Sequence, residues 1–230
     1  MLGIIGAMDV EVEKLRNKME QVETQTVAGM VFHKGKLVGK DVVVVRSGIG
    51  KVNAGLCSQI LVDRYQVDGI VNTGIAGSLR NEVNVGDIVL STTAVQHDVD
   101  AAGFGYAPGE IPQLGTKEFP ADEHLLKLAQ ECCKKANPDI QTFTGRVASG
   151  DQFINDTAKK RWIRDTFDAY CTEMEGAAIA QAAYLNKIPY LIVRAISDKA
   201  DGEANMTYKE FEAQAVEHSV RLMLALLEEM

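Results

Sequence analysis

Asp41-Val42-Val43-Val44-Val45-Arg46 is the stretch of this chain that decides its fold. Four consecutive valines form an apolar run without polar alternation, which is typical of a β-strand buried on both faces. A strand that is covered on both sides needs helices above and below its sheet. The run therefore predicts an α/β fold in which the sheet lies between layers of helices.

Alternating strand-like and helix-like segments fill the rest of the chain. Short apolar, β-rich runs predict strands over residues 2–7, 27–33, 69–73, 85–91, 142–148 and 190–196. Helical spacing of apolar or small residues predicts helices over 9–20, 53–65, 122–136, 156–167, 176–186 and 207–229. Strands separated by helices pair in parallel, so we expect a mixed, mostly parallel β-sheet flanked by helices on both sides. The 230 residues, 46% of them hydrophobic, suffice for one sizeable core, and we predict a single domain over residues 1–230.

Composition and charge argue against several classes of partner. The net charge is −8 and no basic stripe stands out, which argues against nucleic acid. No apolar run reaches the length of a membrane span, and the apolar residues 1–7 lack the basic start of a signal peptide. The four cysteines form no CxxC pair, so free thiols in a reducing cytosol are the simplest interpretation. We therefore expect a cytoplasmic protein whose partner is a small molecule.

Charged residues interrupt the apolar pattern at two places. Glu173 and Glu175 precede the small-residue helix, and Arg194 and Asp198 stand at the end of the apolar run that begins at Pro189. Charges at the end of a buried strand cost free energy unless they are paired or used. A structural ion-pair network is one interpretation, and a polar site built on a hydrophobic frame is the other.

Glycine-rich segments follow two of the predicted strands, at residues 47–51 and 73–78. Neither has the spacing of an ATP-type phosphate loop, and the GxxG at residues 3–6, followed by Asp9 and Glu11, fits a dinucleotide fingerprint poorly. Turn geometry alone would explain these glycines. Glycines at the carboxyl ends of strands also let the backbone approach a ligand in the crevice of an α/β sheet. Because the charged residues share that crevice, we favour a binding site.

Residues 98–120 form the one long irregular stretch, with five Gly or Pro residues between Gly103 and Pro112. A loop of this length in a compact domain is usually functional or part of an interface. His97-Asp98-Val99-Asp100 at its start could suggest a metal site. The chain has only four histidines and no second cluster that would complete a ligand set, so we expect no metal here.

Six short motifs occur in an order that is specific to one family. They are Gly3-Ile4-Ile5-Gly6-Ala7-Met8 with Glu11, Ser47-Gly48-Ile49-Gly50-Lys51-Val52, Asn72-Thr73-Gly74, Ser149-Gly150-Asp151-Gln152-Phe153-Ile154, Glu173-Met174-Glu175 and Val193-Arg194-Ala195-Ile196-Ser197-Asp198. Along essentially its whole length the chain resembles the bacterial 5′-methylthioadenosine/S-adenosylhomocysteine nucleosidases, of the purine nucleoside phosphorylase superfamily.

This resemblance implies a fold, a reaction and a partner. The fold would be the nucleoside phosphorylase-like three-layer sandwich. The reaction would be hydrolysis of the N-glycosidic bond of 5′-methylthioadenosine and S-adenosylhomocysteine, giving adenine and the 5-thioribose sugar. No metal or organic cofactor is implied. A homodimer is implied, in which part of the long loop lines the neighbour's pocket.

The resemblance also implies the catalytic residues. Asp198 matches the acid that protonates adenine at N7, and Glu11 matches the base that activates water at the anomeric carbon. An ordinary aspartic acid has a pKa of about 3.9 and is ionised at neutral pH. Asp198 would therefore need burial or a proton relay to donate, and Ser197 would orient it.

The substrate-binding residues follow from the same resemblance. Glu175 would accept hydrogen bonds from the ribose hydroxyls, Met174 would pack against the sugar, and Arg194 would orient the water and Glu175. Phe153 would stack on adenine, while the backbone of Ile154 reads its edge. The apolar pocket for the 5′-thio group would comprise Met8, Ile49, Phe104, Pro112 and Tyr208, with Phe104 and Pro112 coming from the partner subunit.

One position departs from the family, and rival activities remain open. Ile75 stands where many relatives carry Ser, so a hydroxyl near the ribose and the catalytic water is missing. A purine nucleoside phosphorylase would need an arginine-lined phosphate site, and near the glycine-rich segments only Arg46, Lys51 and Arg80 are basic. A futalosine hydrolase or another nucleosidase would differ in the 5′ group that it accepts. A non-catalytic nucleoside-binding protein would be expected to have lost the acid or the base.

Overall fold

The computed structural model of the chain describes residues 1–199 and 208–230, and it describes side chains over residues 1–199 and 213–230. Its strands are β1 (Leu2–Gly6), β2 (Glu20–Val27), β3 (Met30–Leu37), β4 (Lys40–Arg46), β5 (Gly69–Ser78), β6 (Ile88–Gln96), β7 (Glu118–Pro120), β8 (Thr142–Ser149), β9 (Ala169–Glu173) and β10 (Tyr190–Asp198). Its helices are α1 (Asp9–Arg16), α2 (Lys51–Tyr65), α3 (Glu123–Ala136), α4 (Thr157–Phe167), α5 (Gly176–Asn186) and α6 (Tyr208–Glu229), with a short 3₁₀ helix, η1, at Ala102–Phe104.

All ten strands belong to one sheet with the order β10-β6-β8-β9-β5-β1-β4-β3-β2, and β7 pairs with β6. A further pairing of β10 with β5 closes β5, β9, β8, β6 and β10 into a ring. Strands β4, β1, β5 and β10 run parallel to one another, so their carboxyl ends meet at one edge of the sheet. That edge carries the charged residues that the sequence singles out.

The expectation of a mostly parallel sheet is wrong, because the described part of the chain contains five parallel and five antiparallel pairings. Strands β2, β3 and β4 form an antiparallel meander without crossover helices. Its two turns place Ala28-Gly29 and Val38-Gly39 at positive φ, the geometry of tight hairpin turns. The predicted helix over 9–20 ends at Arg16, and β2 follows as an almost fully exposed strand.

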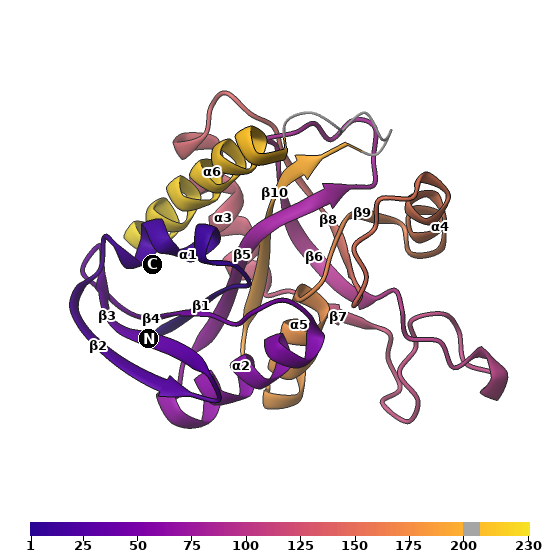
Figure 1. Ribbon diagram of the computed structural model, residues 1–230, viewed down its shortest axis with the longest axis horizontal. Helices are drawn as coiled ribbons and strands as arrows, with labels where there is room; N and C mark the ends of the chain where they lie inside the picture. Colours follow the sequence, from indigo (N-terminus) through magenta and orange to yellow (C-terminus); the bar gives the residue numbers. More distant parts are fainter. Residues whose placement is uncertain (200–207) are drawn as a thin grey trace.

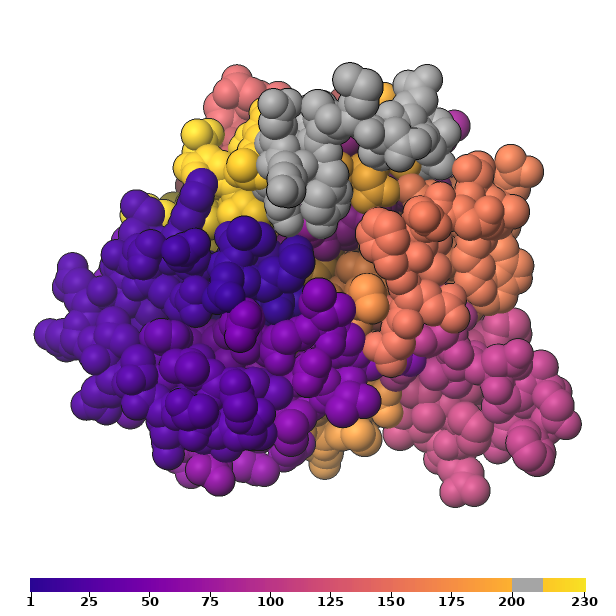
Figure 2. Space-filling model, in the orientation of Figure 1, coloured from indigo at the N-terminus to yellow at the C-terminus, as the bar shows by residue number. Residues whose placement is uncertain are grey.

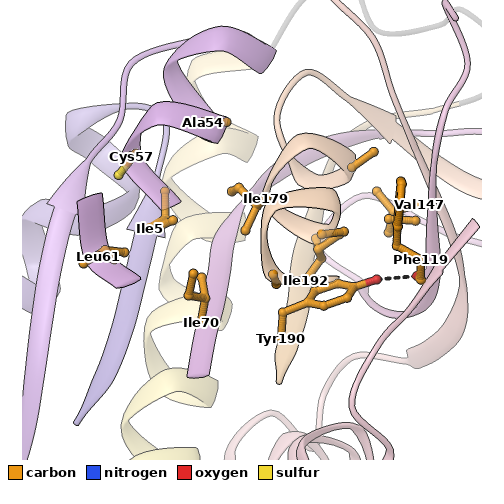
Figure 3. Close-up of a cluster of buried hydrophobic side chains, with 14 of the residues drawn as sticks. Ile5, Ala54, Cys57, Leu61, Ile70, Phe119, Val147, Ile179, Tyr190 and Ile192 are labelled. Atoms are coloured by element: carbon orange, nitrogen blue, oxygen red, sulfur yellow. Dashed lines mark hydrogen bonds between the residues drawn. The ribbon is translucent and has the colours of Figure 1, made fainter. Parts of the chain in front are cut away.

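The valine run does separate two hydrophobic layers, as its lack of alternation predicts. Val43 and Val45 join a cluster that β4 shares with α2 and α5, whereas Val42 and Val44 join a second cluster with α1, α3 and α6. The helices therefore cover both faces of the sheet (Figure 1). Figure 3 shows part of the first cluster, where the hydroxyl of Tyr190 donates a hydrogen bond to the carbonyl of Phe119.

The stretch between β6 and β7 is irregular apart from η1, as the sequence predicts. It protrudes from the body of the molecule below α4 in the view of Figures 1 and 2. Both Phe104 and Pro112 are exposed on it. Among the helices within the described residues, none combines the length and the apolar character needed to cross a membrane.

Candidate active site

A pocket of about 150 Å³ opens at the carboxyl ends of β1, β5 and β10. Eight of the residues predicted for the site line it together: Met8, Glu11, Ile49, Phe153, Met174, Glu175, Ser197 and Asp198. Ala7, Ile75, Ala76, Gly77, Thr172 and Glu173 complete the lining. The structure thus brings together side chains from the first eleven residues and from the last quarter of the chain.

Glu11 lies in the first turn of α1 and folds back over the end of β1. Its Oε2 accepts hydrogen bonds from the backbone N–H groups of Ala7 (2.6 Å) and Met8 (2.9 Å), and its Oε1 accepts one from Ile75 (3.1 Å). The first N–H groups of a helix lack partners within the helix, which is why an acidic side chain is stable here. Burial raises the pKa of Glu11, although Arg194 and the three N–H groups act in the opposite direction. A buried carboxylate with a raised pKa is a better proton acceptor than an exposed one.

Arg194 lies behind the pocket on β10 and is completely buried. Its Nη2 donates to Asn72 Oδ1 (2.5 Å) and to Glu173, and it lies 3.9 Å from Glu175 Oε2. Burial alone would lower the pKa of Arg194, but Glu173, Glu11 and Glu175 raise it overall. Its Nε is buried without a hydrogen-bond partner in the described structure. The guanidinium of Arg194 thus interacts with the negative charges of Glu173, Glu175 and Glu11.

Glu173 is saturated by donors at the N-terminus of α5. Its carboxylate accepts hydrogen bonds from the backbone N–H groups of Gly176 (2.8 and 3.1 Å) and Glu175 (3.2 Å), from the Ser149 hydroxyl and from Arg194. These contacts match those expected of an acidic residue at a helix N-terminus. Glu173 is therefore a structural anchor for the segment that carries Glu175.

Glu175 faces the pocket and is held by the loop before α2. Its Oε1 accepts a hydrogen bond from the backbone N–H of Gly50 at 2.8 Å. Burial and the neighbouring charge of Glu173 raise the pKa of Glu175 to about 7, against the lowering effects of Arg194 and Gly50. Near neutral pH, Glu175 can therefore exist in either protonation state.

Two glycines of β5 allow this cluster to assemble. A Cβ at Gly74 would lie 2.2 Å from Arg194 Nη1 and 2.5 Å from Glu11 Oε1. A Cβ at Gly77 would lie 3.0 Å from Asp198 Oδ2. Residues 73–78, interpreted from sequence as a loop, continue β5 as a strand, and these glycines are needed for the close approach of side chains rather than for a turn.

Asp198 ends β10 at the other side of the pocket. Its Oδ1 accepts a hydrogen bond from the Ser197 hydroxyl (3.3 Å), and its Oδ2 accepts one from Lys160 Nζ (2.7 Å). Lys160 lies on α4, is only 4% exposed, and also donates to the carbonyl of Lys199 at 2.7 Å. Sequence reasoning missed Lys160, but a signal was present: it lies on the same helical face as the buried Ile163 and Phe167.

Proteins with similar sequences identify the family of this chain. The family model described as the phosphorylase superfamily matches residues 1–228. A 5′-methylthioadenosine/S-adenosylhomocysteine nucleosidase from Bacillus cereus (strain AH187) is 44% identical over 230 residues, which cover 100% of this chain and 99% of the relative. The chain belongs to the 5′-methylthioadenosine/S-adenosylhomocysteine nucleosidase family of the phosphorylase superfamily.

Solved structures of such proteins share the fold of this chain. The nucleosidase of this family from Colwellia psychrerythraea 34H, in complex with adenine, superposes with a TM-score of 0.94 at 40% identity, covering 99% of this chain and 94% of that one. A futalosine hydrolase from Helicobacter pylori gives a TM-score of 0.93 at 32% identity, with 100% and 97% covered. The α/β arrangement described above is thus the nucleoside phosphorylase-like fold.

Not every residue that the family resemblance singled out lines the pocket. Ile154 is buried in a small cluster with Leu79 and Ile163, next to the pocket-lining Phe153. Phe104 and Pro112 lie on the protruding loop and do not line the pocket of their own chain. The side chain of Tyr208 lies outside the described residues.

The His97 motif does not form a metal site in the described part of the chain. His97 is buried, and neither ring nitrogen has a hydrogen-bond partner among the described residues. Burial lowers the pKa of His97 more strongly than Asp98 raises it. Within residues 1–199 and 213–230 no group of three or more His, Cys, Asp or Glu side chains could hold an ion.

Proposed function

We propose that this chain, acting as one nucleosidase domain over residues 1–230, hydrolyses the N-glycosidic bond of 5′-methylthioadenosine and S-adenosylhomocysteine. The products are adenine and the 5-thioribose sugar. The observation that carries the proposal is the pairing of a buried, donor-anchored Glu11 with Asp198 in one pocket. The 44% identity to a nucleosidase over the full chain supports the choice of substrate.

Asp198 and Glu11, at opposite ends of the pocket, carry out different steps of the reaction. Adenine is a poor anionic leaving group, so Asp198 delivers a proton to N7 as the bond to the sugar breaks. The sugar gains oxocarbenium character, which the negative charge of Glu11 and Glu175 stabilises, as carboxylates do in glycosidases. Glu11 takes a proton from the attacking water, which adds to the anomeric carbon.

The remaining pocket residues position the substrate. Glu175 accepts hydrogen bonds from the ribose hydroxyls, with Arg194 fixing its orientation from behind. Met174 packs against the sugar, Phe153 stacks on the base, and the Ile154 backbone reads the edge of the base. Met8 and Ile49 supply the apolar surface for the 5′-thio group, and we assign Tyr208 to the same surface.

Isoleucine at position 75, in place of the Ser of many relatives, does not disturb the proposed general base, Glu11. The contact between Ile75 and Glu11 runs through the backbone N–H of Ile75, which any residue at this position would provide. The missing hydroxyl therefore removes a polar contact to the ribose or the water, and affects substrate affinity or rate without displacing Glu11.

The basic residues near the glycine-rich segments do not favour a phosphorylase. Arg46 pairs with Asp9, Lys51 pairs with Asp98, and Arg80 pairs with Asp168. A phosphate ion in place of the attacking water would also lie close to the carboxylates of Glu11 and Glu175, and the like charges would repel one another. Water is therefore the favoured nucleophile.

A second candidate is hydrolysis of a nucleoside with a larger 5′ group. The similarity to a futalosine hydrolase favours it, because that structure matches this chain almost as closely as the adenine complex does. The 5′ end of the pocket decides between them, and in the homodimer proposed below the protruding loop of the partner subunit completes that end.

We also propose a homodimer and a cytoplasmic location. Phe104 is 88% exposed on the protruding loop, which is an unfavourable place for a phenyl ring unless another subunit covers it. The four cysteines are all free and buried, as is usual in a reducing compartment.

The proposed function is tested with a panel of 5′-substituted nucleosides. We expect release of adenine from 5′-methylthioadenosine and S-adenosylhomocysteine, followed by absorbance or chromatography. Futalosine and 5′-deoxyadenosine in the same panel measure the tolerance of the 5′ end. No release of a base from any member of the panel would refute the assignment, and release from futalosine alone would replace it with the second candidate.

A further inference from the structure

We propose that Lys160 supplies the proton that Asp198 passes to the leaving base. The leaving-group acid is then the Lys160–Asp198 ion pair rather than the aspartate alone. The inference rests on the proposed function and deepens it, because it names a positioning residue that the family motifs do not contain. Lys160 acts through Asp198 and does not line the pocket itself.

The contacts of Lys160 make it part of this site. Its Nζ donates to Asp198 Oδ2 and to the Lys199 carbonyl, both at 2.7 Å. Its side chain is only 5% exposed, while that of Asp198 is 17% exposed. The ammonium group is thus withdrawn from solvent, while the carboxylate reaches the pocket.

The local packing gives no structural reason for a lysine at this position. The other buried residues of α4 are Ile163 and Phe167, which pack with Ile154 and Ala169 in an apolar cluster. A buried ammonium group is costly to desolvate, so its presence here needs a partner. Within the described structure those partners are the Asp198 carboxylate and the Lys199 carbonyl, not the apolar cluster, so Lys160 is placed to act on Asp198.

The pair solves the problem that an aspartic acid faces as a donor at neutral pH. An isolated carboxyl group has released its proton by pH 7. A lysine ammonium group, by contrast, is protonated at pH 7. When it is hydrogen bonded to the carboxylate, the pair as a whole retains one transferable proton.

One carboxylate oxygen of Asp198 remains available to the adenine ring of the substrate. Lys160 occupies Oδ2, and the only side-chain contact of Oδ1 within the described structure is the Ser197 hydroxyl at 3.3 Å. That hydroxyl has an alternative acceptor, the Ala76 carbonyl at 3.4 Å, to which it can turn. Oδ1 can then meet N7 of the base.

The proton transfers balance in one turnover. The bond between the anomeric carbon and N9 breaks, and its electron pair goes to adenine. Before that bond breaks, Lys160 gives one proton to the Asp198 carboxylate, which leaves a neutral carboxyl group and a neutral amine, and a half-turn about Cβ–Cγ brings the protonated oxygen to the side that faces N7. The carboxyl group gives this proton to N7 as the bond breaks and becomes a carboxylate again. After adenine leaves, the amine regains one proton from solvent, and Glu11 releases to solvent the proton that it took from the attacking water.

The test begins with Lys160→Met, which keeps the apolar stem as far as the ε-carbon and removes the ammonium group. We expect kcat for 5′-methylthioadenosine to fall on the order of 10²-fold, the usual contribution of a general acid, with KM changed by less than about threefold. Lys159→Met is the matched control, because Lys159 lies one position earlier on α4 and stacks over Trp162. A thermal melt of each variant confirms that it is folded. Near-normal kcat in folded Lys160→Met would overturn the inference.

A double-mutant cycle separates a role through Asp198 from a merely structural one. If Lys160 acts through Asp198, adding Lys160→Met to Asp198→Asn should cost less than about threefold beyond Asp198→Asn alone. Losses that multiply would overturn the inference.

A substrate with a good leaving group also tests whether Lys160 acts through protonation of the leaving group, and it does not need the double variant. A 4-nitrophenyl 5-methylthioriboside releases a phenolate that needs no proton, so Lys160→Met should keep most of the wild-type rate on it. Glu11→Gln should lose activity on both substrates, because both need an activated water. Equal losses of Lys160→Met on the two substrates would contradict the proton role. If wild-type protein released no adenine at all, the proposed function would fail instead, independently of any result with Lys160.

Discussion

The guanidinium of Arg194 is the electrostatic centre of the pocket, because three carboxylates lie around it. Glu173 accepts five hydrogen bonds from four donors and acts as an anchor, whereas Glu11 and Glu175 face the pocket. Burial raises the pKa of both, and that of Glu175 reaches about 7. Glu175 therefore exchanges its proton close to neutral pH, and the raised pKa of Glu11 makes it a stronger proton acceptor than an exposed glutamate, as hydrolysis requires.

Replacing Glu11 separates binding from turnover. In Glu11→Gln the amide oxygen can still accept the backbone N–H bonds of one of the two carboxylate oxygens, but the side chain can no longer take a proton from water. We expect kcat to fall by at least about 10²-fold while 5′-methylthioadenosine still binds, as measured by adenine release and calorimetry. Glu13→Gln is the matched control, because Glu13 is exposed on the same helix. A normal rate in Glu11→Gln would assign the base to another residue.

The raised pKa of Glu175 predicts a pH dependence of stability. The folded chain binds this proton more tightly than the unfolded chain, whose glutamate has the ordinary pKa of 4.5. The stabilisation is present below pH 4.5 and is lost as pH rises through about 7. Between pH 5 and pH 8, wild type should therefore lose on the order of 2 kcal/mol of unfolding free energy relative to Glu175→Gln. Urea unfolding at both pH values measures this, and a pH-independent difference between the two proteins would show that Glu175 is not perturbed.

At the scale of elements, hydrophobic periodicity predicted the segments that bury a continuous stripe or run. The helices α3, α4 and α5 and strand β10 lie where the sequence places them, within about two residues at each end. Strand β2 was missed because it is an exposed edge with a polar sequence, so no apolar pattern marks it. Strand β9, only five residues long, was missed because Glu173 at its end suggested the start of a helix.

The site could be predicted only in part, because some of its contacts depend on how the strands are arranged in space. Family motifs pointed to eight residues that the fold brings into one pocket, although they are far apart in the sequence. Asn72, Ser149 and Lys160 contact the charged residues from neighbouring strands and from α4, and such contacts depend on strand order and register, which the sequence pattern does not specify. Strand order, in turn, depends on the pairing of β10 with both β5 and β6.

The close approach of β5 to the charged cluster is itself testable. In Gly74→Ala the new methyl group would meet Arg194 Nη1 and Glu11 Oε1 well inside van der Waals contact. We expect a loss of about 1–3 kcal/mol in unfolding free energy, together with a large loss of activity, because both charged side chains must shift. Gly55→Ala in α2, where a Cβ would meet nothing within 4 Å, is the control. Wild-type stability and activity in Gly74→Ala would show that the cluster is looser than described.

At the scale of the whole molecule, the protruding loop carries two residues, Phe104 and Pro112, that the family resemblance assigns to the site but that do not line the pocket of their own chain. Both are exposed, and so is the pocket-lining Ile49, at 54%. A second copy of the chain that places its loop over this opening would cover the exposed apolar surfaces and complete the site.

Subunit mixing tests this arrangement. Asp198→Asn chains lack the acid and Phe104→Ala chains lack the loop ring, so each homodimer should be impaired. In a mixed dimer, one of the two pockets has an intact acid and receives an intact loop from its partner. We expect the mixture to regain activity toward one quarter of wild type, because half of the dimers are mixed and each has one complete pocket. Light scattering gives the oligomeric state, and no gain on mixing would argue that each pocket is complete within one chain.

The identity of the sugar product tests the central claim most directly. Wild-type protein is incubated with 5′-methylthioadenosine in buffers with and without excess inorganic phosphate, and the products are followed by mass spectrometry. We predict equal amounts of adenine and free 5-methylthioribose at the same rate in both buffers. A requirement for phosphate, or formation of 5-methylthioribose 1-phosphate, would contradict hydrolysis and identify the protein as a phosphorylase.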